Sequence, residues 1–213
     1  MADVTLTNVS KSFGKEIGLD DVSMTVPDGS FVVLLGPTGA GKTTTLRMVS
    51  GLDKPDSGRV TIGGRDMAGV TPAQRDVTMV FQQYSLYPHL TVRQNLEFPL
   101  KSPILKTPQD EINRKVNEVA EVLQISHKLD NKATALSGGE MQRVSIGRAL
   151  DRQPSVYWMD EALSSMDEKL RSDLQIELKS IQDNSGATYL YVTHDQIEAM
   201  TMATHVGVLD HGN

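Results

Sequence analysis

The segment GPTGAGKTT at residues 36–44 constrains the fold of this chain more than any other stretch. It matches the pattern G-x-x-x-x-G-K-[ST] through Gly36, Gly41, Lys42 and Thr43, follows the apolar run FVVLL and opens a helical pattern. Glycines let successive backbone N–H groups curl around a phosphate, and a helix N-terminus adds partial positive charge. An ordinary glycine turn would not need this context. The segment therefore predicts a strand, a phosphate-binding loop and a helix.

The remaining periodicity places this loop in an α/β fold. The first 65 residues alternate in short runs separated by turn signals, which predicts strands. From about 84 to 150 the chain is expected to be mostly helical, since Ile112, Val116 and Leu123 recur at helical spacing. Beyond 150, apolar strands alternate with helices, which is typical of crossover units in a parallel sheet.

Composition excludes several classes of site and location. The chain has 213 residues, a formal net charge of −6 and no cysteine, so disulfides, thiolate metal sites and cysteine nucleophiles are excluded. The acidic balance disfavours a broad nucleic-acid-binding face, and we expect no nucleic-acid partner. The N-terminus lacks the pattern of a signal peptide, and FVVLL is too short to span a bilayer. We expect a cytoplasmic protein that reaches a membrane only through a partner.

The segment LSGGEMQ at 136–142 has two compatible interpretations. Ser137 and Glu140 form S-x-x-E, a capping box that opens the following helix. A capping box does not need glycine at its first helical positions, yet Gly138 and Gly139 stand there. Glycine permits close approach of the backbone to a bulky group, and a bare helix N-terminus favours an anion. The segment therefore predicts a second phosphate contact.

The strand pattern VYWMD ends in two adjacent acids, Asp160 and Glu161. Adjacent residues on a strand point to opposite sides, so the two carboxylates can serve different targets. Ligands bind at the carboxyl ends of strands in open α/β sheets. Two close anions repel each other, and Mg²⁺ together with Lys42 would compensate that repulsion.

LSGGEMQRVSIGRAL resembles the signature segment of ABC (ATP-binding cassette) ATPases. Phe13, the phosphate loop, VFQQYSLYPHLTV, the acidic strand end, SSMD and YVTHD follow in the order of the other motifs of that family. QQYSLYPHLTVRQNLEFPL and THDQIEAMTMA further resemble ATPase subunits of carbohydrate importers of the maltose and glycerol-phosphate type. The resemblance covers essentially the whole chain.

The resemblance implies one ABC ATPase domain over 1–213. Its fold class would be α/β, with a P-loop NTPase core of mainly parallel sheet flanked by helices and an N-terminal antiparallel β subdomain. The β subdomain and the core would take about 1–83 and 151–213. A helical subdomain at about 84–150 would carry the signature segment. These importer ATPases normally continue into a C-terminal regulatory domain, which we expect to be absent here.

The resemblance also assigns roles to individual residues. Glu161 would polarise the attacking water, while His194 and Gln82 would complete the catalytic set; Gln83, beside Gln82, leaves that last assignment slightly ambiguous. Mg²⁺ would be held by Thr43, Gln82 and Asp160. ATP, the expected nucleotide, would be contacted by Phe13, Gly36, Pro37, Thr38, Gly39, Ala40, Gly41, Lys42, Thr43, Thr44, Ser137, Gly138, Gly139 and Asp167.

Several of these residues could instead have a purely structural role. Phe13 could make a local core contact, Asp167 could be a helix N-cap, and a lone histidine such as His194 is more often structural. His89, His127, His205 and His211 are interpreted as structural or surface residues.

Partners are implied by the same resemblance. In this family two ATPase domains pair head to tail, so that each ATP lies between the phosphate loop of one and the signature segment of the other. We therefore expect a homodimer or a pair with a related subunit, peripheral on the inner face of the membrane. Tyr84, Leu86, Tyr87 and Leu90 suggest an exposed docking groove for a membrane permease, and their alternative is the core of the helical segment.

One residue departs from the family pattern. Proline usually follows the catalytic glutamate, whereas Ala162 stands here. Proline would fix φ and remove one N–H, so we expect altered geometry or a lower rate. The resemblance implies ATP hydrolysis that powers the import of a solute, expected to be a sugar or a related compound. The alternatives are a nucleotide-binding module with impaired hydrolysis, or a soluble ABC ATPase outside transport.

Overall fold

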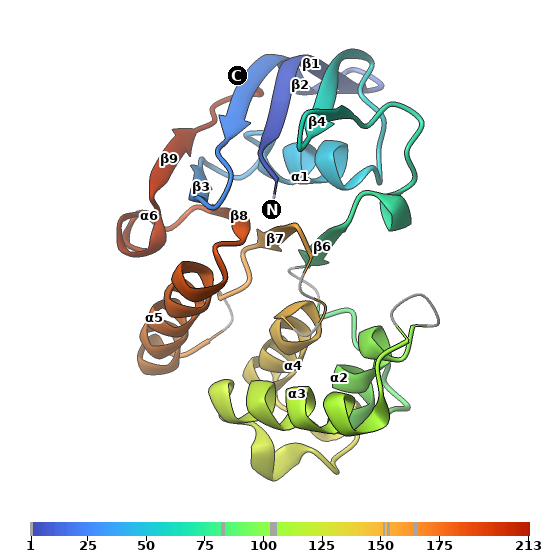
Figure 1. The fold of residues 1–213 in the computed structure, drawn as a ribbon. Helices are drawn as coiled ribbons and strands as arrows, with labels where there is room; N and C mark the ends of the chain where they lie inside the picture. The colour runs from blue at the N-terminus through green and yellow to red at the C-terminus, as the bar shows by residue number, and fades with distance from the viewer. Residues whose placement is uncertain (1, 82–83, 103–105, 151, 153, 164–165) are drawn as a thin grey trace. The chain divides into compact units, whose positions relative to one another are not determined.

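The computed structural model describes residues 2–81, 84–102, 106–150, 152, 154–163 and 166–213 (Figure 1). Its strands are β1 (Val4–Phe13), β2 (Glu16–Val26), β3 (Phe31–Leu35), β4 (Ser57–Ile62), β5 (Arg65–Asp66), β6 (Val77–Val80), β7 (Val156–Asp160), β8 (Thr188–Thr193) and β9 (His205–Val208). Its α-helices are α1 (Lys42–Ser50), α2 (Val92–Leu100), α3 (Gln109–Val122), α4 (Gly138–Leu150), α5 (Glu168–Ser185) and α6 (Gln196–Met202).

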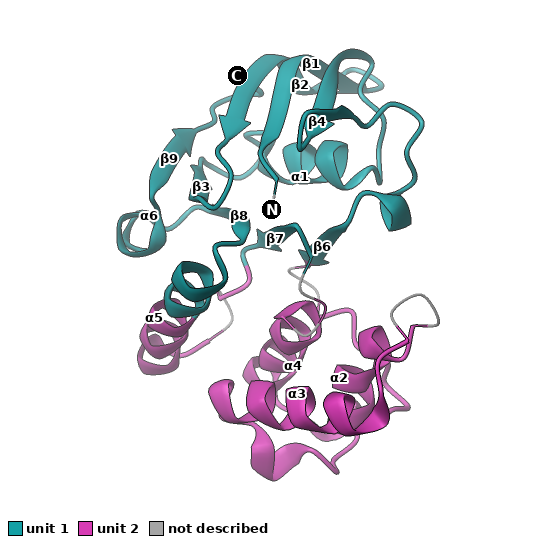
Figure 2. Ribbon diagram, viewed as in Figure 1, with its two compact units in different colours: residues 1–79, 154–161, 178–213 teal, residues 80–153, 162–177 magenta. Residues whose placement is uncertain are grey.

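The chain forms two compact units (Figure 2). The first consists of residues 1–79, 154–161 and 178–213, and the second of residues 80–153 and 162–177. The second unit therefore contains the segment 84–150 that the sequence predicts to be mostly helical.

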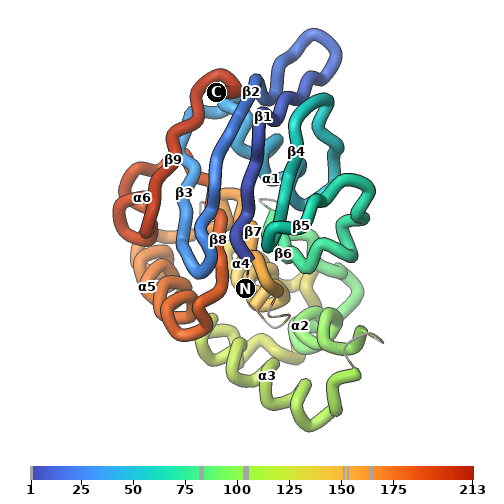
Figure 3. The backbone as a smooth tube through the Cα atoms, turned by 45° about the horizontal axis from the view of Figure 1, so that its top comes forward, coloured from blue at the N-terminus to red at the C-terminus, as the bar shows by residue number. Residues whose placement is uncertain are grey.

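Two sheets make up the first unit, as the sequence analysis predicts. One has the strand order β2-β1-β4-β5 and pairs antiparallel. The other has the order β6-β7-β8-β3-β9, and its pairs β7–β8, β8–β3 and β3–β9 are parallel. Figure 3 shows β1, β2 and β4 running side by side in the first of these sheets. The predicted α/β class is confirmed.

A single apolar core joins α1 to both sheets. Alternate residues of β3, β7 and β8 face this core, among them Val32, Trp158 and Leu190. They meet Leu46 of α1 and residues of β1, β2 and β4. On the opposite face of the parallel sheet stand other aromatic residues: Tyr189 stacks on Phe31 at 5.1 Å and on Tyr157 at 4.5 Å between ring centroids. Both faces of the sheet are thus buried, which explains the continuous apolar runs of its strands.

Arg75 anchors the C-terminal end of α1. Its side chain is buried, and its guanidinium donates to four backbone oxygens, those of Met48, Val49, Met67 and Val70, at 2.8–3.1 Å. Two of these oxygens belong to the last turn of α1, where a cation also complements the helix dipole. Burial lowers the pKa of the Arg75 guanidinium. One side chain therefore fastens this helix to the loop that follows β5.

Helices α2, α3 and α4 build the second unit. The amphipathic spacing predicted for α3 is confirmed, since Ile112, Val116 and Ala120 are buried. Gly147 of α4 faces side chains of α2 and α3 in this packing. A Cβ there would stand 2.7–2.9 Å from side-chain atoms of Leu96, Val119 and Leu123. The lack of a side chain at position 147 therefore lets α4 approach α2 and α3.

Candidate functional site

The phosphate loop connects β3 to α1, and its glycines are required by close backbone approach. Gly41 is the N-cap of α1 with φ 99°, a conformation that L side chains rarely adopt. A Cβ on Gly41 would clash with the carbonyl oxygen of Gly18, and one on Gly36 would clash with that of Leu209. The loop is therefore held by its neighbours in a form that only glycine permits at these positions.

Lys42 folds back over its own loop. The residue is buried at 6% exposure, and its Nζ donates to the backbone oxygens of Gly36 at 2.7 Å and Pro37 at 2.9 Å. These carbonyls hold the ammonium at the mouth of the loop. The predicted lysine thus lies where a phosphate bound by the loop would meet it.

Asp160, at the end of β7, lies beside the first turn of α1. The Thr43 hydroxyl donates to Oδ2 of Asp160 at 3.3 Å, and Asp160 is 8% exposed. Burial raises the pKa of the Asp160 carboxyl, and Glu161 raises it further, while Thr43 and Lys42 oppose the rise. A hydroxyl and one carboxylate, completed by phosphate oxygens and water, form the oxygen donor set that suits Mg²⁺. A bound cation would also stabilise the charge of the buried Asp160 carboxylate. Thr43 and Asp160 therefore fit a magnesium ion.

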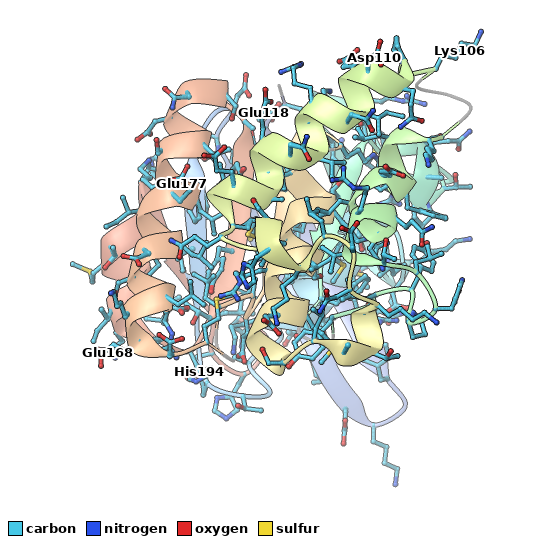
Figure 4. All side chains as sticks on the ribbon, turned by 90° about the horizontal axis from the view of Figure 1, so that it is seen from below. Lys106, Asp110, Glu118, Glu168, Glu177 and His194 are labelled. Carbon is cyan, nitrogen blue, oxygen red and sulfur yellow. The ribbon has the colours of Figure 1, made fainter. Side chains whose placement is uncertain are left out.

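Glu161 adopts a left-handed backbone conformation with φ 45°. Its N–H donates to the Val192 oxygen at 3.0 Å, and its Oε1 lies 3.0 Å from Nδ1 of His194. An ionised carboxylate only accepts, so His194 donates from Nδ1 in this contact, and Nε2 is the ring nitrogen left for another partner. The His194 side chain is 59% exposed and projects from the ribbon in Figure 4. Ala162, which follows, is fully buried.

These side chains meet because the strands that carry them are parallel. In register, Asp160 pairs with Val192 and Leu35 pairs with Thr193. The ends of β3, β7 and β8 thus lie together, followed by the phosphate loop, Glu161 and His194 respectively. This is the edge at which open α/β sheets bind ligands.

Phe13 lies next to the same loop. The residue is 46% exposed, and a Cβ on Gly18 would be 3.1 Å both from the Phe13 ring and from the Thr44 side chain. Lys11 lies 5.6 Å from the ring centroid. The ring is therefore a partly exposed flat surface beside the loop rather than a core contact.

The signature segment lies in the second unit, and its capping box is confirmed. The Ser137 N–H donates to Glu140 at 2.7 Å, and the Glu140 N–H reaches the Ser137 hydroxyl at 3.4 Å. The Ser137 N–H, aided by Lys128, lowers the pKa of Glu140 to about 2. A Cβ on Gly138 would be 2.9 Å from the Tyr84 hydroxyl, whereas one on Gly139 would meet nothing within 4 Å. Nothing within the described part of the chain explains glycine at position 139.

The other predicted residues of the second unit have the following environments. Asp167 accepts from the Leu170 N–H at 3.0 Å, so it caps the start of α5. Leu86 and Tyr87 are half-buried rather than exposed, because Tyr87 packs on Phe98 at 4.3 Å and beneath the Arg148 guanidinium at 4.8 Å. Tyr84 and Leu90 are half-buried as well. Gln82 and Gln83 lie outside the described residues. His89 and His127 are exposed, as are His205 and His211 of the first unit, in keeping with a surface role.

Sequence reasoning missed Glu198, a buried carboxylate behind His194. It is 3% exposed and accepts hydrogen bonds from Tyr191 and Thr193. Its position three residues after the N-cap Asp195 is a local signal, but that signal alone predicts an exposed helix cap.

Comparison with known proteins identifies the family. The ABC transporter family model matches residues 19–164, which include the phosphate loop, the signature segment and both acids. The chain belongs to the ABC transporter family.

Curated relatives of this ABC protein share about half of its residues. It is 49% identical to the trehalose/maltose import ATP-binding protein MalK of Thermococcus litoralis, over 100% of this chain and 58% of that protein. It is also 49% identical to the sn-glycerol-3-phosphate import ATP-binding protein UgpC of Brucella abortus, over 100% of this chain and 60% of that protein. The chain thus spans less than two thirds of the length of these relatives.

Solved structures of this family superpose closely on the chain. A dimeric bacterial ABC transporter cassette matches with TM-score 0.89 and 31% identity, over 98% of this chain and 95% of that one. A dimeric cassette in a post-hydrolysis state, bound to ADP and Pi, matches with the same TM-score and 30% identity over the same shares. Among the helices that the structure describes, none is long and apolar enough to cross a membrane.

Proposed function

We propose that this chain binds ATP with Mg²⁺ and hydrolyses it to ADP and phosphate, and that the hydrolysis powers solute import through a membrane permease. The observation that carries the proposal is the convergence of the phosphate loop, Asp160, Glu161 and His194 at one edge of the parallel sheet. A triphosphate bound at this edge would meet the Lys42 ammonium, a metal site and a general base.

Each residue of this edge has a chemical task in the proposal. Lys42 exchanges its two loop carbonyls for β- and γ-phosphate oxygens, and the loop N–H groups hold the same phosphates. Thr43 and Asp160 would hold Mg²⁺, and the metal ion would neutralise part of the phosphate charge. Glu161 accepts a proton from the attacking water, and His194 donates a hydrogen bond to the γ-phosphate. Phe13 provides a face on which the adenine stacks.

Gln82 is proposed as the remaining member of the site, at the metal and the water. A second copy of the chain would complete the site. Ser137, Gly138 and Gly139 would contact the γ-phosphate bound by a partner copy, and Asp167 would couple the two sites. Two observations support this: a Cβ at position 139 would meet nothing within 4 Å among the described residues, and two solved cassettes similar in fold are dimers. A glycine with nothing beside it leaves the helix N-terminus accessible to phosphate.

The membrane partner is proposed to dock near Tyr84, Leu86 and Tyr87. The half-exposed aromatic pair Tyr87–Phe98, with Phe98 50% exposed, offers apolar surface for a short helix. The solute is proposed to be a sugar or a polyol phosphate, as the names of the relatives say of those proteins. The chain would then work at the cytoplasmic face of the membrane.

Glu161→Gln tests hydrolysis directly. The amide keeps the size of the side chain but cannot take a proton, so we expect the hydrolysis rate to fall by about a factor of 10²–10⁴ while ATP binding persists. Size-exclusion chromatography should then show an ATP-dependent dimer. Glu118→Gln on α3 removes an exposed charge as a matched control and should leave the rate unchanged. Equal rates in the wild type and Glu161→Gln would refute the role of Glu161.

Leu86→Glu tests docking. It should lower transport by the assembled transporter while sparing hydrolysis by the isolated chain, because charge is placed in an apolar contact. Equal loss of transport and of hydrolysis would contradict a docking role.

A further inference from the structure

We infer that Glu198 is a positioning residue for His194, acting through Thr193. The inference rests on the proposed function, in which His194 contacts the γ-phosphate. His194 is largely exposed and lies between a strand and a helix, so its placement needs support from the residues on either side. A buried polar relay provides that support.

The relay starts at the Glu198 carboxylate in the first turn of α6. One oxygen, Oε2, accepts from the Tyr191 hydroxyl at 2.9 Å and from the Thr193 hydroxyl at 2.7 Å. Glu198 is 3% exposed and forms no ion pair among the described residues. Its charge is instead stabilised by these two hydroxyls and by the helix N-terminus that Asp195 caps. A buried carboxylate held in this way is costly to displace.

Thr193 passes this constraint to the backbone around His194. A carboxylate can only accept, so the single hydroxyl proton of Thr193 points at Glu198. The lone pairs of Thr193 Oγ1 are thereby available to the Asp195 N–H, which donates at 3.0 Å. Thr193 and Asp195 immediately precede and follow His194. The relay thus fixes both peptide neighbours of the histidine.

Tyr191 provides an internal comparison. Its hydroxyl donates to the same carboxylate oxygen, but it lies two residues before Thr193 within the buried strand β8. Loss of the Tyr191 hydroxyl removes one hydrogen bond to Glu198 and leaves the Thr193–Asp195 contact in place. A purely structural role for Glu198 predicts similar effects for both hydroxyls, whereas a positioning role predicts an effect of Thr193 alone on His194.

The test compares Glu198→Met, Thr193→Val, Glu198→Gln and Tyr191→Phe in the chain as it stands. The first readout is the imidazole ¹⁵N–¹H spectrum, in which the His194 signals are assigned by their loss in His194→Ala. We expect these signals to move in Glu198→Met and Thr193→Val. Their chemical shifts should be unchanged in Tyr191→Phe. They should be nearly unchanged in Glu198→Gln, because the amide keeps an acceptor oxygen.

The second readout is ATP hydrolysis. We expect kcat to fall about tenfold in Glu198→Met and Thr193→Val, the effect of one hydrogen bond misplaced in the transition state. KM for ATP should stay within about twofold, since the phosphate loop is untouched. Signals that move equally in Tyr191→Phe and Thr193→Val, or that move in neither, would overturn the inference. Absence of hydrolysis in the wild type would instead refute the proposed function, while the spectra still decide the positioning.

Discussion

Replacing Arg75 by methionine should destabilise the first unit by about 3 kcal/mol. The substitution keeps a long apolar stem but removes the guanidinium that satisfies four backbone oxygens at 2.8–3.1 Å. Leaving a buried acceptor without its partner costs about 1–3 kcal/mol. A cavity of about 470 Å³, which Arg75 helps to line, lets water reach some of the freed oxygens. The total loss therefore stays well below the sum over the four oxygens.

Urea unfolding at neutral pH, followed by circular dichroism, measures this loss as a fall in the midpoint at unchanged slope. In a thermal melt, a loss of about 3 kcal/mol corresponds to a fall in Tm of about 6–12 °C for a chain of this size. Arg59→Met is a matched control, because Arg59 lines the same cavity but is exposed. It should shift Tm by less than about 2 °C. A change below about 0.5 kcal/mol in Arg75→Met would refute the view that this side chain anchors α1.

Three further perturbations have defined outcomes. Ala162→Pro should alter turnover, because a residue before proline is driven to extended φ whereas Glu161 has φ 45°; unchanged turnover and Tm would contradict this. Gly147→Val should cost about 1–3 kcal/mol in urea unfolding through overcrowding in the second unit, with Gly139→Val, at an uncrowded position of the same helix, as the control. Below its ordinary pKa of 4.5, the stabilisation from Glu140 should be lost progressively as pH falls towards about 2. Glu140→Gln should therefore be less stable than the wild type at pH 7 and equal to it near pH 2, and a constant difference would be the contrary result.

The sequence predicted those parts of the site that arise from local chemistry. A glycine loop between a strand and a helix, and adjacent acids at a strand end, have geometric consequences that depend on few other residues. The ends of β3, β7 and β8 then coincide because the strands are parallel. The class of fold and the location of Asp160 and Glu161 followed from this.

The parts that could not be predicted depend on tertiary contacts. Arg75 resembles any surface arginine in sequence, yet four carbonyls from α1 and the segment after β5 enclose it. Glu198 reads as an exposed cap until β8 brings two hydroxyls to it. Tyr87 was expected on an exposed face, but Arg148, distant in sequence, covers its ring. Local patterns do not encode which distant groups will satisfy a buried polar atom.

The Lys42 ammonium is hydrogen-bonded by carbonyl oxygens of its own loop. In the proposed function, the oxygens of Gly36 and Pro37 would compete with a phosphate for the three N–H bonds of the ammonium, so the net affinity for nucleotide would be a difference between two sets of contacts. Such an exchange would lower the free-energy cost of product release, because the ammonium would return to the two carbonyl oxygens as the product leaves. In the proposed turnover cycle, product release would then leave no unpaired buried charge on Lys42.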